Sequence, residues 1–303
     1  MPVWIRRVPS VLAASGALLL AGCGTPEGVD GDLTGQWVGM PEPVSFVPAA
    51  EVCHAGHSGG IVRLSEYRPV PCDEPHRLET VHVGAFTGET ADRHTPPPPG
   101  SPELREAFAE CDARAADFLG GDFRSARLTL GVVRPSERAW SGGARWFRCD
   151  VAEWEDYERF RTVRRTGSLR DELAGESPLR RGCFDPTFTD GGGLVEEMNP
   201  VDCDESHSTE FVGAWLAPDT LYMDVDDEEV LNRAHRECLS VVADYVDVPD
   251  DADLPFRVST LVAGPGEEQW EAGDRGFLCY LYLWNRKVTE SLADAGQAGL
   301  PVQ

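Results

Sequence analysis

Nine cysteines constrain this chain more than any other feature, because eight of them repeat in order. Of these eight, the first four are each matched by another cysteine 127 to 131 residues later. Regular sets of cysteines are typical of exported domains that are held together by disulfides. We therefore expect two copies of one disulfide-stapled domain outside the cytoplasm. The two sets are Cys53, Cys72, Cys111 and Cys149, and then Cys183, Cys203, Cys238 and Cys279.

The ninth cysteine, Cys23, closes a segment with the features of a lipoprotein signal. Residues 1–22 have a short basic start and an apolar run that is too short to span a bilayer. Leu20-Ala21-Gly22 precedes Cys23, as in sequences that are cleaved ahead of a lipid-modified cysteine. An ordinary signal peptide followed by a chance cysteine is the alternative. We expect a lipoprotein carrying palmitate or similar chains on Cys23, held on the extracytoplasmic face of the cell membrane, with residues 23–50 as a tether.

The net charge of −25 restricts the partners of this chain. Residues 1–22 contain two arginines and no acidic residue, so their removal changes the charge from −25 to −27. A surface this acidic repels nucleic acid phosphates and anionic headgroups. We therefore expect no nucleic acid partner; envelope or division proteins and cell-wall polymer remain.

Residues other than cysteine also recur between the two sets. Cys72-Asp73-Glu74-Pro75-His76 is matched by Cys203-Asp204-Glu205-Ser206-His207, and residues 83–86 by residues 212–215. Thr166-Gly167-Ser168-Leu169 is echoed by Thr289-Glu290-Ser291-Leu292. This pattern predicts a duplication. Near the end of each copy, Pro135, Glu137, Trp140, Gly143, Arg145, Phe147, Cys149 and Trp154 are matched 130 positions later by Pro265, Glu267, Trp270, Gly273, Arg275, Phe277, Cys279 and Trp284.

Each copy has the same predicted order of elements: a strand, a helix and two further strands. The expected strands are residues 78–86, 126–133 and 144–151, and then 209–216, 256–263 and 276–284. Ser101-Pro102-Glu103 begins the first helix, and Asp226 or Asp227 the second. The expected buried stripes are Leu104, Phe108, Cys111, Ala115 and Phe118, and then Leu231, Ala234, Cys238, Val241 and Tyr245.

The predicted elements favour one pairing of the cysteines. The third cysteine of each copy lies on the buried helix face, and the fourth shares a strand face with Phe147 and Val151, or with Phe277 and Leu281. Both therefore point to one helix–sheet core. Four cysteines allow three connectivities, so this pairing is a hypothesis. It gives Cys111–Cys149 and Cys238–Cys279, with Cys53–Cys72 and Cys183–Cys203 closing loops at the start of each domain.

These motifs resemble the actinobacterial septum formation family. Its domain has a Gly-x-Cys-Phe opening, a Val-x-Cys-x-x-x-His-x-x-Glu strand entry, a helix with a cysteine, and a Trp-x-x-Gly-x-Arg-x-x-x-Cys strand. Gly182-Cys183-Phe184 supplies the opening of the second copy, and residues 70–79 the entry of the first. Glu51-Val52-Cys53-His54 departs from the opening, and Ser206 from the usual proline.

The resemblance covers nearly all of residues 51–292 and implies a link to cell division. It implies no catalytic activity and no cofactor. The expected fold is α+β: two tandem domains, each with a small antiparallel sheet and one packed helix. The expected boundaries are residues 51–154 and 182–292 for the copies, 155–181 for a linker and 293–303 for a tail.

His76 with Glu79, and His207 with Glu210, are the strongest candidates for a functional site. A histidine and a carboxylate together perform acid–base catalysis or bind a metal. Three-residue spacing on an extended segment, however, sends the two side chains to opposite faces. Neither a nucleophilic serine nor a glycine-rich loop accompanies them in both copies. We therefore favour histidines that pin the turn after the cysteine.

Other candidates have a structural interpretation that we prefer. His54 and His57 beside Cys53 resemble a zinc site, but the second copy lacks them and a bridged cysteine does not ligate. The acidic residues 224–229 lack the spacing of a calcium loop and suit a helix N-terminus. Trp140 and Trp270 either stack on sugars or fill the edge of a core. Arg145 and Arg275 are expected to pair with Asp73/Glu74 and Asp204/Glu205.

The expected linker carries a basic cluster in an otherwise acidic chain. We expect these arginines to pair with acidic groups of the flanking domains, with docking of an acidic partner or an anionic envelope polymer as the alternative. The cluster is Arg159, Arg161, Arg164, Arg165, Arg170, Arg180 and Arg181.

Taken together, these features favour a protein that binds or scaffolds at the cell envelope and is not an enzyme. The competing hypothesis is an envelope hydrolase or transferase that uses His76 and His207. A third hypothesis is a structural pair of domains that presents the arginine cluster to a partner.

Overall fold

The computed structural model describes residues 44–56, 61–62, 64–155, 161–189, 194–218 and 228–301. The expected signal, most of the expected tether, and Cys23 lie outside the described residues. All helices and strands of the described residues lie within one compact unit, Ser45–Gln303. No helix among the described residues is long and apolar enough to cross a membrane. We call residues 45–181 the first half and residues 182–301 the second half.

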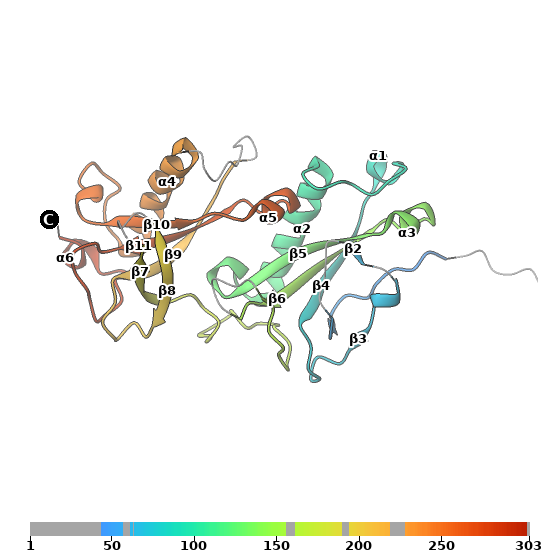
Figure 1. The fold of residues 1–303 in the computed structure, drawn as a ribbon, viewed down its shortest axis with the longest axis horizontal. Helices are drawn as coiled ribbons and strands as arrows, with labels where there is room; N and C mark the ends of the chain where they lie inside the picture. The colour runs from blue at the N-terminus through green and yellow to red at the C-terminus, as the bar shows by residue number, and fades with distance from the viewer. Residues whose placement is uncertain are drawn as a thin grey trace, which may run out of the picture. The chain divides into compact units, whose positions relative to one another are not determined.

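A six-stranded sheet forms the centre of the first half (Figure 1). Neighbouring strands are antiparallel except β2, which runs parallel to the end of β5. An all-antiparallel sheet was expected, so β2 is a correction. The strands, in their order across the sheet, are β2 (Ile61–Val62), β5 (Leu128–Pro135), β6 (Trp146–Glu153), β4 (Leu78–Ala85), β1 (Val52–His54) and β3 (Pro69–Val70).

The second half contains a five-stranded sheet in which all neighbours are antiparallel. Its order is β10 (Ser259–Ala263), β11 (Gly276–Tyr282), β9 (Thr209–Leu216), β7 (Cys183–Phe188) and β8 (Val195–Val201). The six strands predicted from the sequence are present in the two sheets, with ends that differ by a few residues. β1, β3, β7 and β8 were not predicted. They carry or follow the first cysteine of each half, where a loop was expected.

One long helix packs on each sheet (Figure 1). α2 (Pro102–Leu119) begins where the Ser101 hydroxyl accepts a hydrogen bond from Leu104 N (3.3 Å) and ends at Gly120, whose φ of 76° terminates the helix. It covers β4, β5 and β6. α4 (Glu228–Val246) covers β9, β10 and β11. Shorter helices are α1 (Gly88–Ala91), α3 (Glu137–Ser141), α5 (Glu267–Ala272), α6 (Gly296–Gly299), η1 (Leu64–Glu66), η2 (Phe123–Ser125) and η3 (Leu254–Phe256).

The buried face of α2 is the predicted stripe, and all five of its residues belong to the core. The stripe predicted for α4 is partly wrong. Leu231 is 39% exposed, whereas Val230 and Val242 are buried beside Ala234 and Cys238. Several apolar residues adjoin one another along α4, so periodicity alone allowed more than one stripe.

Four disulfides connect these elements, and they are the pairs that the sequence favoured. In each half one bond joins the helix to a central strand, and the other joins the first strand, β1 or β7, to the segment just before β4 or β9. In the chain-entropy model, closing loops of 19 or 20 residues contributes about 3 kcal/mol, and loops of 38 to 41 residues about 4 kcal/mol. The bonds are Cys53–Cys72, Cys111–Cys149, Cys183–Cys203 and Cys238–Cys279.

Strand register relates the two sheets residue by residue. β4 skips Val81 in its pairing with β6, and β9 skips Val212 in its pairing with β11, so both sheets carry an irregularity at positions 131 residues apart. Gly84 lies opposite Phe147, and Trp215 lies opposite Phe277. The sequence match of residues 83–86 with 212–215 is therefore displaced by two residues, and Gly84 corresponds to Trp215.

The segment expected as a linker packs into the first half. Leu169, Leu173 and Leu179 are buried in the core beneath α2. In the second half, Leu292 and Leu300 are buried beside α4, although residues 293–303 were expected to be a tail. Each sheet is thus followed by a segment that folds back on its own half. We call residues 161–179 and 288–300 the return segments.

Candidate functional site

His76 and His207 hold the return segments in place. Both are fully buried, and their Nδ1 atoms lie 2.8 Å from the carbonyl oxygens of Glu74 and Glu205. Their backbones form isolated bridges with the return segments, His76 with Arg165 and His207 with Val288. Buried and bonded in this way, the two imidazoles are shielded from any substrate.

Glu79 and Glu210 fix the same segments through their carboxylates. Glu79 accepts hydrogen bonds from Ser168 Oγ (2.6 Å) and Leu169 N (2.7 Å). Glu210 accepts from Ser291 Oγ (2.9 Å) and Leu292 N (2.9 Å). The Thr-x-Ser-Leu sequence that recurs in both halves therefore supplies the donors for a buried glutamate.

One expectation about these pairs is wrong. His207 and Glu210 do not point to opposite faces, because His207 Nε2 lies 3.1 Å from Glu210 Oε1. The alternation rule fails because His207 precedes β9, which begins at Thr209. The preference for a structural histidine nevertheless agrees with the burial of His76 and His207 and with their partners.

The geometry does not favour a metal at these sites. Atoms of Cys53, His76 and Glu79 lie within 4.8 Å of one another, as do those of Cys183, His207 and Glu210. The two sulfurs are bonded in disulfides, and a metal requires the thiolate. His57 and residues 224–227 of the acidic run lie outside the described residues.

Trp140 fills the core and is not a platform for sugars. It is fully buried, and its indole N–H donates to the carbonyl of Arg93 (2.7 Å). Arg145 lies over the ring at 4.2 Å and donates to the Trp140 carbonyl (2.6 Å). The ion pair expected between Arg145 and Asp73 or Glu74 is therefore wrong. Trp270 is half-buried, and Arg275 lies over its ring at 3.9 Å.

Most of the described arginines of the basic cluster are already engaged. Three form ion pairs: two with Glu51 and Glu153 of the first expected domain, as expected, and one with Glu155, which lies in the expected linker itself. Arg180 and Arg181 donate to backbone carbonyls, and Arg159 lies outside the described residues. The ion pairs are Arg161 with Glu155 (2.8 Å), Arg165 with Glu153 (3.2 Å) and Arg170 with Glu51 (2.8 Å).

A buried polar cluster lies on the face of the first sheet opposite α2. It consists of His54, Thr80, Arg148 and Asp150. Thr80 Oγ1 donates to Asp150 Oδ1 (2.7 Å), so His54 Nε2–H is the donor in its 3.1 Å contact with Thr80 Oγ1. Arg148 donates to Asp150 Oδ2 through Nε (3.0 Å) and Nη2 (2.6 Å).

The environment of this cluster shifts its titration. Burial lowers the pKa of His54 from 6.5 to about 4, and the positive charge of Arg148 acts in the same direction. Burial raises the pKa of the Asp150 carboxyl, while the Arg148 guanidinium opposes that rise. The cluster is therefore a neutral histidine attached to a buried ion pair.

The second half carries three aromatic residues and a leucine at the same positions. Strand register matches His54 to Phe184, Thr80 to Phe211, Arg148 to Leu278 and Asp150 to Tyr280. Phe184, Phe211 and Tyr280 form a buried aromatic cluster, with ring centroids 5.5 and 5.7 Å from that of Tyr280. This backbone arrangement therefore accepts an apolar filling at these positions.

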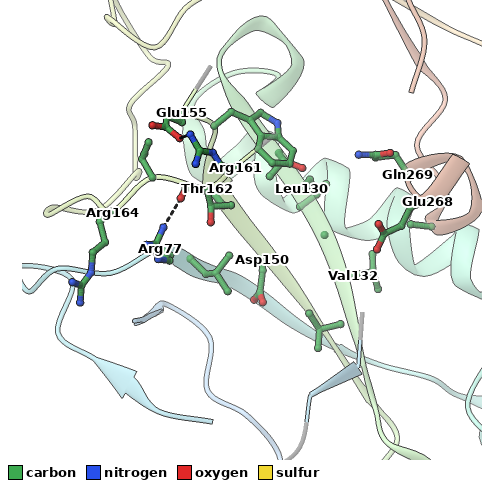
Figure 2. Close-up of a pocket in the computed structure, with 18 residues that line it drawn as sticks. Arg77, Leu130, Val132, Asp150, Glu155, Arg161, Thr162, Arg164, Glu268 and Gln269 are labelled. Atoms are coloured by element: carbon green, nitrogen blue, oxygen red, sulfur yellow. Dashed lines mark hydrogen bonds and ion pairs between the residues drawn. The ribbon is translucent and has the colours of Figure 1, made fainter. Parts of the chain in front are cut away.

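A groove of about 790 Å³ adjoins the polar cluster (Figure 2). Five consecutive residues of β5, Thr129 to Val133, line it together with Asp150 and Ala152 of β6. Arg77, Arg161 and Arg164 line a second wall near the return segment, where Arg77 Nη1 donates to the Thr162 carbonyl (2.5 Å). Glu268 and Gln269 of α5 line a third. We call this the β5 groove.

Small residues account for the floor of the β5 groove. Gly131 and Ala152 correspond by register to Leu261 and Tyr282, and Asp150 corresponds to Tyr280. The second sheet thus has large side chains where the first sheet has its hollow, and a smaller cavity of about 190 Å³, lined by Leu261 and Tyr280 among others, remains there. Residues that the two halves share do not reveal the groove. The positions that indicate the groove are those at which the first half has a smaller residue than the second.

Comparisons with known proteins give one result. No curated protein and no solved structure matches this chain. The model of one family, described as septum formation, matches residues 51–279, which is about three quarters of the sequence. The chain therefore belongs to the septum formation family.

Proposed function

We propose that this protein is a lipid-anchored extracytoplasmic protein that binds a component of the cell envelope during division, and that the β5 groove is its binding site. Acylation of Cys23 would hold the chain at the membrane, with residues 24–50 as the tether. Membership of the septum formation family supports the link to division. Four disulfides support an oxidising compartment outside the cytoplasm.

The two halves are, on this proposal, tandem copies of one domain. The order β5-β6-β4-β1-β3 in the first sheet corresponds to β10-β11-β9-β7-β8 in the second. Pro69-Val70 and Pro200-Val201 pair with the first strand of their sheets in the same register. Including the return segments, we place the boundaries at about residues 45–181 and 182–301.

Binding is favoured over catalysis by the burial of His76 and His207. A general acid or base must lie within hydrogen-bond reach of its substrate. Both imidazoles are fully buried, and their Nδ1 atoms already contact carbonyl oxygens of the chain. The recurring histidines, glutamates and Trp–Arg stacks therefore maintain the fold.

The proposal rests on the β5 groove of the first sheet, because larger side chains occupy the corresponding positions of the second sheet. Gly131, Ala152 and Asp150 stand where the second half has Leu261, Tyr282 and Tyr280. Because both halves have the same fold, stability alone does not require the first half to carry smaller residues than the second at these positions. This difference separates a copy with a groove of about 790 Å³ from a copy whose corresponding cavity is only about 190 Å³.

The test is the location of a fluorescent fusion of the full chain in dividing cells. We expect the native fusion at the membrane with enrichment at the septum. Cys23→Ala should release it from the membrane fraction. The filled-groove variant, Gly131→Leu with Ala152→Tyr, should stay at the membrane and lose septal enrichment. Enrichment of the filled-groove variant equal to that of the native fusion would refute the groove as the binding site.

A matched control comes from the second half. Ser259 corresponds to Thr129 and lies exposed on the edge strand β10. Ser259→Leu enlarges that edge without entering the β5 groove, so this variant should keep both membrane attachment and septal enrichment. Its loss of enrichment would show that the assay responds to any enlarged side chain.

A further inference from the structure

We propose that the occupant of the β5 groove is an extended polypeptide segment of a partner, added as a strand along the outer edge of β5 and bearing a carboxylate that pairs with Arg164. This inference rests on the proposed function of the groove and names the chemistry of its partner. It uses three independent observations: the open edge of β5, the shape of the floor and the charge on the rim.

The edge of β5 is the first observation. β2 pairs only with Arg134 and Pro135, and although α5 contacts β5, no described strand pairs with residues 128–133 on the side away from β6. These residues read Leu-Thr-Leu-Gly-Val-Val, without a charge or a proline. Uncovered edges normally carry charges, prolines or bulges that discourage pairing. An apolar edge that faces a groove is instead suited to the addition of a strand.

The floor of the groove is the second observation. A Cβ placed on Gly131 would have only the Asp150 carbonyl oxygen within 4 Å, at 4.0 Å, so space lies above this residue. Thr129 and Gly131 are half-buried, whereas their neighbours in β5 are buried. An added strand places alternate side chains on each face of the sheet. One of its side chains would therefore occupy the hollow above Gly131 and Ala152.

The rim supplies the third observation. Of the four arginines between residues 161 and 170, Arg164 is the one without an acidic partner among the described residues. It is exposed and lines the groove. In a chain of net charge −25, an unpaired guanidinium beside a binding groove favours a carboxylate on the occupant.

Two other occupants fit these observations less well. A glycan would use exposed aromatic faces and would gain nothing from a strand edge, although Trp154 lines one part of the groove. A second copy of this chain would bring another charge of −25 to the same surface, which opposes association. We therefore commit to a partner polypeptide and treat both alternatives as outcomes of the test.

The experiment uses a displayed library of random twelve-residue peptides. The target is the purified oxidised chain with Cys23→Ser, which removes the site of acylation. Parallel selections use the filled-groove variant and Ser259→Leu. We expect peptides that bind the parent chain and Ser259→Leu but not the filled-groove variant, with β-branched residues and an Asp or Glu in common. Equal enrichment on all three targets, or none, would overturn the inference.

Synthetic versions of the selected peptides test the mode of binding. N-methylation of the alternate amides that face β5 should weaken binding about tenfold or more, because backbone hydrogen bonds are lost. Changing the peptide carboxylate to an amide should weaken binding about two- to fivefold on the parent chain and should have no effect on Arg164→Gln. Insensitivity to N-methylation would contradict strand addition.

Failure of this inference can be told apart from failure of the proposed function. If groove filling abolishes septal enrichment while peptides fail and cell-wall glycan fragments bind the parent chain, the groove is the binding site and its occupant is a glycan. Sedimentation of the purified chain tests self-association. A dimer that the filled-groove variant does not form would replace the partner strand by a second copy.

Discussion

Replacing the polar cluster of the first half by its counterparts in the second half tests whether that cluster serves the fold. The change is His54→Phe, Thr80→Phe, Arg148→Leu and Asp150→Tyr in one protein. Strand register places the corresponding side chains of the second half at these four positions. The chain therefore supplies its own apolar replacement.

The single variant Arg148→Leu gives the contrasting magnitude. It leaves Asp150, which is 2% exposed, as an unpaired buried carboxylate, and breaking a buried pair in this way costs about 3–5 kcal/mol. Replacing a buried ion pair by well-packed apolar residues is neutral or stabilises by about 1–4 kcal/mol. We therefore expect the single variant to lose several kcal/mol and the fourfold variant to regain them.

The assay is equilibrium denaturation by guanidinium chloride at pH 7 with the disulfides intact. Circular dichroism and tryptophan fluorescence follow unfolding, and the change that distinguishes both variants from the parent chain should fall in the transition of the first half, because the two halves have separate cores. A fourfold variant that is as unstable as Arg148→Leu would refute the reasoning, because the polar cluster would then be required by the fold.

Three further predictions follow from the same contacts. Because the pKa of His54 is lowered from 6.5 to about 4, protons bind the unfolded chain first as pH falls, so this residue's contribution to stability is present above pH 6.5 and is lost toward pH 4. Denaturation should show that the parent chain loses about 2 kcal/mol more than His54→Phe between pH 7 and pH 5; equal slopes would contradict the burial of a neutral imidazole. Cys111→Ala with Cys149→Ala should cost about 4 kcal/mol in the same assay, and an unchanged midpoint would show that this bond does not constrain the unfolded chain. Glu210→Ala should cost about 3 kcal/mol by stranding buried donors, including Leu292 N, and should expose the second return segment to limited proteolysis; full protease resistance would show that the carboxylate does not hold it.

Periodicity and cysteine spacing predicted the parts of the fold that follow local rules. The α2 stripe, the central strands and the four disulfide pairs follow from repeats of two, of 3.6 and of about 130 residues. β1 and β7 were missed because strands of only three and six residues beside a cysteine give little alternation. The second stripe was misplaced at Leu231 because adjacent apolar residues fit more than one face.

The site could be predicted only in part, for a physical reason. His76, Glu79, His207 and Glu210 were visible because both halves need the same clamp on the return segment, so their residues recur. The β5 groove depends on Gly131 and Ala152, which are ordinary residues until the register shows which larger side chains occupy their places in the second sheet. Long-range strand pairing determines that correspondence, and no local pattern encodes it.

The most direct test of the account is photo-crosslinking in living, dividing cells from two corresponding edge positions. A photoreactive amino acid replaces Thr129 in one strain and Ser259 in another, with the rest of the full chain unchanged. The account predicts a defined covalent adduct to an envelope component from position 129 and none from position 259. Equal adducts from both positions, or an adduct from position 259 alone, would contradict the claim that the first half carries the binding surface.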